Sequence, residues 1–152
     1  MSEDRPKAYG LNRLRETFVV REETAKSMRA NRSAETQPER RLRRALWAVG
    51  ARGYRKNDKR WPGKPDLYFA GARLCVYVNG CFWHGCPECG RSLKPATNRV
   101  YWEAKIARNQ ERDTEVAEAL ELLGLRRMVV WECELKADLP SVVLRILEAI
   151  RT

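Results

Sequence analysis

The chain has 152 residues, 33% of them charged, and its thirty lysines and arginines against twenty aspartates and glutamates give a net charge of +10. No apolar run approaches the roughly 20 residues of a membrane span, and the N-terminus lacks the hydrophobic core of a signal peptide, so we expect one cytoplasmic domain. The charge favours a polyanionic partner, above all nucleic acid. Basic ribosomal and membrane-surface proteins share such an excess, but no strongly amphipathic basic helix supports the membrane alternative.

The N-terminal part is polar and mixed in charge, with no sustained periodicity. Residues 1–23 are therefore predicted to form a flexible extension to a domain that spans 24–152. The segment 24–32 contains several basic residues, among them Arg29, and a single methionine, Met28, and it predicts a short basic helix. That helix is either a solvated face or a clamp on DNA.

A longer helix is predicted from about Pro38 to Val49. Thr36 and Glu39 have the Thr-x-x-Glu spacing of a capping box, and apolar residues follow at helical spacing. Glu39 therefore has a local role available, in which its carboxylate accepts a hydrogen bond from the Thr36 backbone. On helix propensity alone, this capping role is the better interpretation of Glu39.

Two strands are predicted next, joined by a tight turn. A loop rich in proline and glycine opens into a short strand with Asp66 at its first position, and a hairpin at 70–72 leads into the apolar strand 74–78. A Pro-Asp pair at the start of a strand usually marks only a turn. Asp66 becomes a candidate functional residue because the second strand leads directly into a loop in which cysteines, aromatics and the histidine are close together.

That loop follows Val78 and holds three cysteines, two large aromatics and the only histidine of the chain. Cys81, Cys86 and Cys89 could surround one ion, and Cys133, at the end of a distant strand, could complete a tetrahedral site. The expected metal is Zn²⁺ in a closed, structural site, because four buried thiolates need its charge. Disulfides and buried free thiols are the alternatives, and His84 could replace one cysteine as a ligand.

Phe82 and Trp83 lie between the predicted zinc ligands. A loop held by zinc would have difficulty burying both side chains, which favours an outward orientation. The alternative is that they fill a small core over the metal, and composition does not decide between the two.

A long helix is predicted from Asn98, as its cap, to Leu123, followed by a strand at 126–131 and a last helix from about Asp138. A strand, helix and strand with connections of this length imply a parallel crossover. The fold class is therefore α/β, a single domain with one mixed sheet flanked by helices. The long helix also carries a basic stripe that could face phosphate, formed by Lys105, Arg108 and Arg112.

Several stretches stand in a fixed order: Met28-Arg29, Thr36-x-Pro-Glu39, Pro62-Gly-Lys-Pro-Asp66, Asn79-Gly-Cys-Phe-Trp-His84, Tyr101-Trp102-x-x-Lys105-Ile106 and Val130-Trp-Glu-Cys133. Taken together, they resemble the very-short-patch mismatch repair endonucleases, from about residue 24 to residue 137. The likeness is specific because no single common motif carries it. It implies a restriction-endonuclease-like fold and a Mg²⁺-dependent nick on the 5′ side of the thymine in a T:G mismatch, which arises when 5-methylcytosine deaminates.

The resemblance also assigns catalytic roles. Asp66 would be the carboxylate that binds Mg²⁺, the backbone carbonyl of Val78 would help to hold the ion, and Glu39 would orient water around it. His84 would be the charged or proton-carrying group near the scissile phosphate. Asn79 occupies a further catalytic position, where we expect aspartate or histidine; an amide can neither carry the negative charge nor take up the proton.

The remaining roles concern zinc and DNA. Cys81, Cys86, Cys89 and Cys133 match the structural zinc positions, some of which are histidine in relatives. Met28 matches a side chain of an N-terminal clamp. The aromatics that match the residues wedged into the DNA stack beside the mismatch are Phe82, Trp83 and Trp102.

The leading hypothesis is thus a DNA repair endonuclease that acts on double-stranded DNA with a T:G mismatch. We expect a monomer, since a nick needs one active site. The implied partners are a cytosine-5 methyltransferase system and downstream repair proteins at the nucleoid. One alternative is a binding module for mismatched or distorted DNA that cuts weakly, for which Asn79 is the reason. The other is a nuclease of the same fold with another DNA target.

Overall fold

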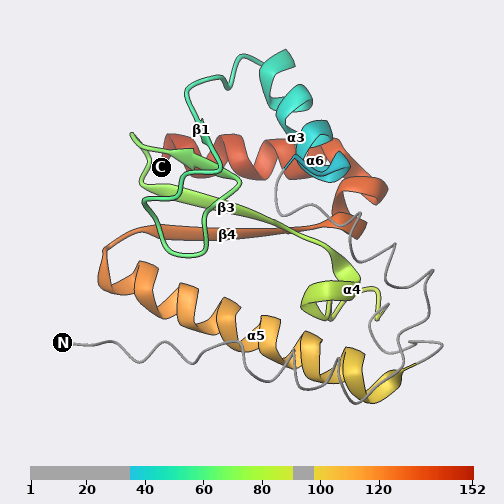
Figure 1. Ribbon diagram of the computed structural model, residues 1–152. Helices are drawn as coiled ribbons and strands as arrows, with labels where there is room; N and C mark the ends of the chain where they lie inside the picture. The colour runs from blue at the N-terminus through green and yellow to red at the C-terminus, as the bar shows by residue number, and fades with distance from the viewer. Residues whose placement is uncertain (1–34, 91–97) are drawn as a thin grey trace.

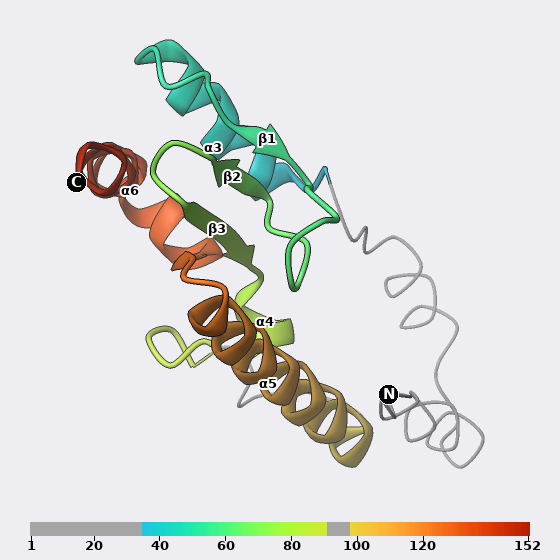
Figure 2. The ribbon, with the colours of Figure 1, turned by 90° about the vertical axis from the view of Figure 1, so that its left-hand side faces the viewer.

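The computed structural model describes residues 35–90 and 98–152 of the chain. Four strands form one mixed sheet in the order β1-β2-β3-β4, in which β3 and β4 are parallel and the other neighbours are antiparallel. Helices α3 and α6 lie on one side of the sheet and α5 on the other (Figure 1 and Figure 2). In chain order the elements are α3 (Gln37–Ala48), β1 (Arg55–Lys56), β2 (Leu67–Phe69), β3 (Leu74–Asn79), α4 (Cys81–His84), α5 (Arg99–Leu122), β4 (Arg126–Trp131) and α6 (Glu132–Arg151).

This architecture confirms the predicted α/β class and the parallel crossover, which runs from β3 through α5 to β4. Among the described helices, none is long and apolar enough to cross a membrane. The predicted extension 1–23 and the basic helix 24–32, with Met28 and Arg29, lie outside the described residues.

Side chains that alternate along the strands divide between two hydrophobic clusters, one on each face of the sheet. The cluster on the face toward α5 is small: it consists of Tyr68, Cys75 and Tyr77, which pack against Leu120 and its neighbours. The opposite face, toward α3 and α6, carries the larger core. It contains Leu42, Leu46, Leu67, Phe69, Leu74, Val76, Val130, Leu135, Val142, Val143 and Ile146.

The first described helix confirms the prediction within a residue at each end, but the role of Glu39 differs. The Glu39 carboxylate accepts hydrogen bonds from the backbone N–H of Glu35 at 2.9 Å and from the hydroxyl of Thr36 at 3.1 Å. The predicted acceptance from the Thr36 backbone N–H is therefore replaced by two other contacts. Glu39 is only 4% exposed, which capping alone does not require.

One helix boundary differs from prediction, while the cap of α5 lies where it was predicted. The last helix begins at Glu132 rather than near Asp138, where the backbone leaves helical geometry with φ −156° and ψ 75°. The Asp138 carboxylate accepts from the N–H and hydroxyl of Ser141 at 3.2 and 2.6 Å, so it caps the second helical segment. Asn98 occupies the N-cap position of α5 but makes no capping hydrogen bond through its side chain.

Candidate active site and metal centre

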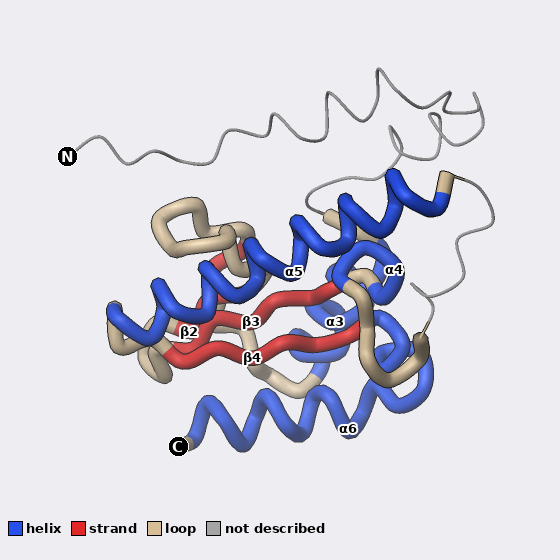
Figure 3. The backbone as a smooth tube through the Cα atoms, turned by 90° about the horizontal axis from the view of Figure 1, so that it is seen from below, coloured by secondary structure: helices blue, strands red, loops and turns tan. Residues whose placement is uncertain are grey.

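A groove of about 970 Å³ opens where the first turn of α3, the end of β3, α4 and the middle of α5 meet. Helix α4 lies beside α5 at this end of the sheet, as seen from below (Figure 3). Four residues predicted to be catalytic line the groove together: Glu39, Asp66, Asn79 and His84.

Asp66 lies immediately before β2, at the end of a turn that is fixed from two sides. The hydroxyl of Tyr77 donates to the carbonyl of Pro62 at 2.6 Å, which ties the turn to β3. Gly63 has φ +72°, and a Cβ there would come within 2.8 Å of Val116 on α5, so the close approach requires glycine. The turn thus delivers Asp66 to β3, where the backbone N–H of Val78 donates to its Oδ2 at 2.6 Å.

The carboxyl groups of Asp66 and Glu39 are neighbours in this wall of the groove. Burial and the negative charge of Glu39 raise the pKa of Asp66 to about 7, while the hydrogen bond from Val78 acts in the opposite direction. Two acidic groups held together in a largely buried place repel each other when both are ionised. A bound cation removes that repulsion, so the pair is suited to hold one.

The donor set indicates which cation fits. Carboxylate oxygens are hard ligands, and Mg²⁺ is usually held by one or two carboxylates together with water and phosphate oxygens. Asp66 and Glu39 supply two carboxylates at the wall of an open groove. The residues present therefore fit Mg²⁺ with room for substrate oxygens.

His84, at the end of α4, faces Asp113 on α5. Its Nδ1 lies 2.7 Å from Asp113 Oδ2, and the two side chains are 28% and 27% exposed. The carboxylate orients the ring and leaves Nε2 as the second nitrogen available to the groove. Asp113 is a site residue that the sequence analysis missed, because it lies 29 positions from His84 and beside the basic residues of the predicted stripe.

Helix α5 holds α4 through backbone contacts as well. The side-chain amide of Asn109 donates to the carbonyl of Trp83 at 2.8 Å, and that of Gln110 donates to the carbonyl of His84 at 3.4 Å. A helix of four residues cannot stabilise itself. These contacts with α5 therefore fix the position of His84 in the groove.

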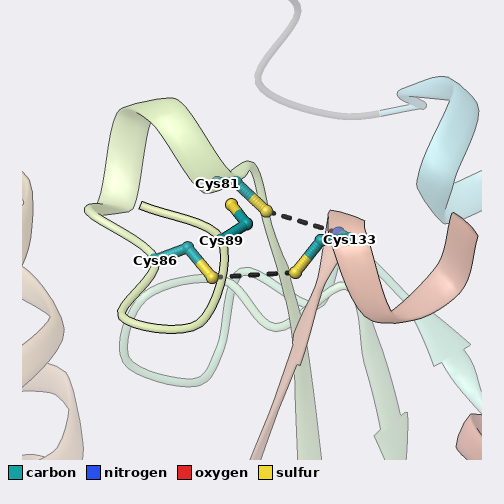
Figure 4. A group of neighbouring side chains, drawn as sticks. All are labelled: Cys81, Cys86, Cys89 and Cys133. Atoms are coloured by element: carbon teal, nitrogen blue, oxygen red, sulfur yellow. Dashed lines mark hydrogen bonds between the residues drawn. The ribbon is translucent and has the colours of Figure 1, made fainter. Parts of the chain in front are cut away.

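Behind α4, four cysteines converge (Figure 4). The sulfurs of Cys81, Cys86, Cys89 and Cys133 all lie within 4.8 Å of one another. Those of Cys86 and Cys133 are 3.7 Å apart, and the backbone N–H of Cys133 donates to the sulfur of Cys81 at 3.3 Å. Tetrahedral zinc with Zn–S bonds of about 2.3 Å separates its sulfurs by about 3.8 Å, so the cluster fits this metal.

The structure weighs against two of the alternatives for these cysteines, disulfides and a His84 ligand. All five cysteines of the chain are free thiols, and the fifth, Cys75, is buried in the sheet away from the cluster. His84 pairs with Asp113 and is not a member of the group of four. Burial raises the pKa of the Cys81 thiol, so the crowded group needs a metal ion to ionise.

Comparison with known proteins gives a consistent result. A family model described as DNA mismatch endonuclease Vsr matches residues 18–91. The type II nicking enzyme V.NmeAIP of Neisseria meningitidis is 45% identical over 104 residues, which are 68% of this chain and 73% of that protein. The chain belongs to the Vsr family. It is similar to the type II nicking enzyme V.NaeI of Lentzea aerocolonigenes, with 42% identity over 124 residues (78% of this chain, 73% of the relative). It is also similar to the DNA mismatch endonuclease Vsr of Escherichia coli K12, with 38% identity over 112 residues (74% and 70%).

Membership of the Vsr family confirms the resemblance found in the sequence, and it makes the chain a DNA endonuclease. DNA is accordingly its macromolecular partner. The groove of this chain is lined by an acidic pair, Asp66 and Glu39, and by the histidine of α4.

The aromatics of this Vsr-family chain form one cluster at the edge of the groove, which Trp83 lines. The rings of Phe82, Trp83 and Trp102 contact each other edge to face, with centroids 5.3 to 5.6 Å apart. The ammonium group of Lys105 lies 4.5 Å from the centroid of the Trp83 ring. Trp102 is buried, with 7% of its surface exposed, whereas Phe82 and Trp83 are half-buried. Neither sequence alternative therefore holds fully, because the cluster is packed at its base and open at its edge.

Asn79 is the last residue of β3 and is 6% exposed. It lines the groove together with Asp66 and His84, as the resemblance implies. Its amide offers a donor and an acceptor at this position but no ionisable group.

Proposed function

We propose that this endonuclease nicks duplex DNA on the 5′ side of the thymine in a T:G mismatch, with Mg²⁺ as its catalytic metal. The observation that carries the proposal is that a pair of carboxyl groups and a histidine–carboxylate pair line one groove. Asp66 with Glu39 forms one wall, His84 with Asp113 forms another, and the aromatic cluster stands beside them. This arrangement supports the proposal, because it would bring metal binding, proton transfer and base unstacking together in one site.

In this proposal Asp66 binds the metal directly, the backbone carbonyl of Val78 adds a second oxygen, and Glu39 orients water beside them. When bound, Mg²⁺ polarises the phosphate and lowers the pKa of a water molecule. The Val78 N–H keeps one oxygen of Asp66 occupied, which fixes the direction of the carboxylate. Asp66 and Glu39 must both be ionised for this role, which the raised pKa of Asp66 makes dependent on pH.

His84 handles the proton in the same scheme. Asp113 accepts at Nδ1 and stabilises the protonated ring, so that Nε2 can donate to the phosphate or the leaving oxygen. Asn79 orients a group by hydrogen bonding and takes no proton. The activation of water therefore falls to the metal and to Glu39.

Selection of the mismatch rests on the aromatic cluster. Inserting Phe82 and Trp83 into the base stack, with Trp102 as their support, costs a few kcal/mol for each unstacked step, and least at a mispair. Lys105 adds a positive charge over the Trp83 ring, where it can meet phosphate or a base. The wedge and His84 belong to the same short helix, so unstacking and cleavage are mechanically linked.

The proposal has consequences for zinc and for partners. Zinc at Cys81, Cys86, Cys89 and Cys133 ties α4 to the start of α6 and has a structural role. Because T:G arises from deaminated 5-methylcytosine, a cytosine-5 methyltransferase produces the precursor and repair proteins act on the nick. We propose that the enzyme works at the nucleoid as a monomer, since one nick needs one active site.

The test is a gel assay with end-labelled duplexes, T:G mismatched and fully paired, with and without Mg²⁺, and with Asp66→Ala beside the wild type. We expect a Mg²⁺-dependent nick 5′ of the mismatched thymine that Asp66→Ala abolishes. Equal cutting of paired DNA would favour a nuclease with another target. Tight binding to T:G without any cut would instead favour the binding module, and Asn79→Asp would then be the next variant to make.

A further inference from the structure

Arg43 lies one helical turn after Glu39 on α3, with a side chain that is only 12% exposed. Its Nη2 donates to Glu35 Oε2 at 2.5 Å. Its Nη1 points toward Glu39 Oε2 at 3.7 Å, which is within ion-pair reach but too long for a hydrogen bond. This nitrogen is fully buried and has no hydrogen-bond partner among the described residues.

The guanidinium group stands behind the groove rather than in it. Of the described residues, Glu35, Glu39 and Arg40 line the groove, and Arg43 does not. Arg43 therefore has no direct contact to offer to DNA or to a metal in the groove. Any influence on the reaction must pass through the two glutamates that it contacts.

We propose that Arg43 is a positioning residue for Glu39, whose carboxylate it holds beside Asp66 from the next turn on the same face of α3. Three cationic or donor groups then surround the Glu39 carboxylate: the Glu35 N–H, the Thr36 hydroxyl and the Arg43 guanidinium. The fork of arginine suits this place because its two ends serve two carboxylates, which the single ammonium of lysine does not.

The charge pattern favours this role over a simple surface ion pair. Glu35 is contacted by Arg43 and has two further cations nearby, Arg40 at 3.8 Å and Lys56 at 4.0 Å. Glu39 has Arg43 as its ion-pair partner in the described chain and sits against another acid. A buried guanidinium beside two crowded carboxyl groups keeps Glu39 in one place before the metal arrives.

This inference rests on the proposed function, in which Glu39 serves a divalent cation bound at Asp66. The test measures Mg²⁺ binding to the DNA-free, zinc-loaded protein by titration calorimetry, for wild type, Arg43→Met, Glu39→Gln and the double variant. We expect Arg43→Met to weaken Mg²⁺ binding by about threefold, because the ion must then order Glu39 itself. In the Glu39→Gln background the same substitution should change the affinity by less than about 1.5-fold, since the effect passes through Glu39.

Arg40→Met is the matched control. Arg40 stands on the same helix, also pairs with Glu35 and is 58% exposed. The loss of a positive charge alone would tighten Mg²⁺ binding in both variants. Weaker binding in Arg43→Met together with unchanged or tighter binding in Arg40→Met therefore identifies positioning. Arg43→Lys, which keeps the charge and the apolar stem, replaces Arg43→Met if thermal unfolding shows that the latter is not folded, and the same loss is expected.

Mg²⁺ binding in Arg43→Met as tight as in wild type, or an equal loss in the Glu39→Gln background, would overturn the inference. So would a wild type that binds no Mg²⁺. The nicking assay is scored separately. If the wild type shows the expected binding pattern but cuts no T:G duplex, the proposed reaction fails while the role of Arg43 stands.

Discussion

Asp66 is largely buried, and its two neighbours, Glu39 and the Val78 N–H, shift the pKa of its carboxyl group in opposite directions. Burial and the charge of Glu39 raise the pKa of Asp66 to about 7 from the 3.8 of the free residue, against the Val78 N–H donor. Between about pH 4 and pH 7 the native state thus binds more protons than the unfolded chain, and stability falls as pH rises. Asp66→Asn cannot ionise, so we predict that it stabilises the Mg²⁺-free protein at about pH 8 by on the order of 1–3 kcal/mol, with little effect near pH 4.

Thermal unfolding of the zinc-loaded protein across this pH range measures the difference. Asp113→Asn is a suitable control, since Asp113 is a groove aspartate that is 27% exposed and faces a histidine instead of an acid. Parallel stability curves for wild type and Asp66→Asn would contradict the prediction.

Asp113 should act through His84. Asparagine at this position can still hydrogen bond to the ring, but it cannot stabilise the imidazolium, so we predict that Asp113→Asn lowers the single-turnover nicking rate by about 10- to 100-fold. DNA affinity should stay within about twofold, because the carboxylate engages the histidine. Glu111→Gln, an exposed acid on the same helix, is the control and should leave the rate unchanged. A similar loss of nicking rate in both variants would contradict the prediction that Asp113 acts through His84.

Single residues also show what sequence reasoning could reach. The four cysteines were predictable, because three lie close in the chain and few other roles suit such a cluster. Asp113 was not, because its partnership with His84 depends on the rotation of α5 about its axis. The predicted contact of Glu39 was wrong in detail. The capping spacing is visible in the sequence, but the sequence does not show that Asp66 and Arg43 lie against the same carboxylate.

Among the elements, α4 depends most on its surroundings. It has four residues, and its loop continues into Cys86 and Cys89 without further regular structure. We predict that elemental analysis finds about one zinc per chain, and that Cys133→Ser loses the metal and unfolds the protein. Cys75→Ala is the matched control, because that buried thiol lies outside the cluster, and it should retain zinc. Metal-free protein with unchanged stability would contradict a structural zinc.

Elements with strong local signals were predicted well, and those that depend on tertiary contacts were not. The helical period of α3 and the apolar run of β3 appear in the sequence itself. The pair Arg55–Lys56 becomes strand β1 only because β2 offers a hydrogen-bonding edge. The first segment of α6 is capped by Glu134, which accepts from the Trp131 N–H, and it is tied to the cysteine loop by the Cys133 N–H, a tertiary contact that the prediction of a helix from Asp138 did not include.

At the level of the whole molecule, strand β3 connects the groove, the cysteine cluster and the aromatic cluster. Val78 near its end donates to Asp66, Asn79 lines the groove, and the next residues enter α4 with the first zinc ligand and the aromatic cluster. In the proposed mechanism, metal binding, mismatch insertion and structural zinc would be joined by a few consecutive residues at the end of β3 and in α4. A distortion of DNA that moved α4 would then act directly on Asp66 and Glu39.

The open edge of the aromatic cluster should therefore decide mismatch recognition. We predict that Trp83→Ala weakens binding to a T:G duplex by about 10-fold, a loss of roughly 1–3 kcal/mol for one stacked base, and binding to the paired duplex by less than about threefold. Fluorescence anisotropy with the two duplexes, without Mg²⁺ so that no strand is cut, measures both affinities.

Trp47→Ala is the matched control for this measurement. Trp47 is 53% exposed at the end of α3, is covered in part by Arg52 and is not among the described residues of the groove. Its removal should leave both affinities unchanged. Equal losses on the mismatched and paired duplexes in Trp83→Ala would mean that the indole supports the fold of α4 rather than entering the base stack. The half-buried position of Trp83, with its carbonyl held by Asn109 and its ring beside Lys105, favours insertion, because the backbone is fixed while the ring edge stays accessible.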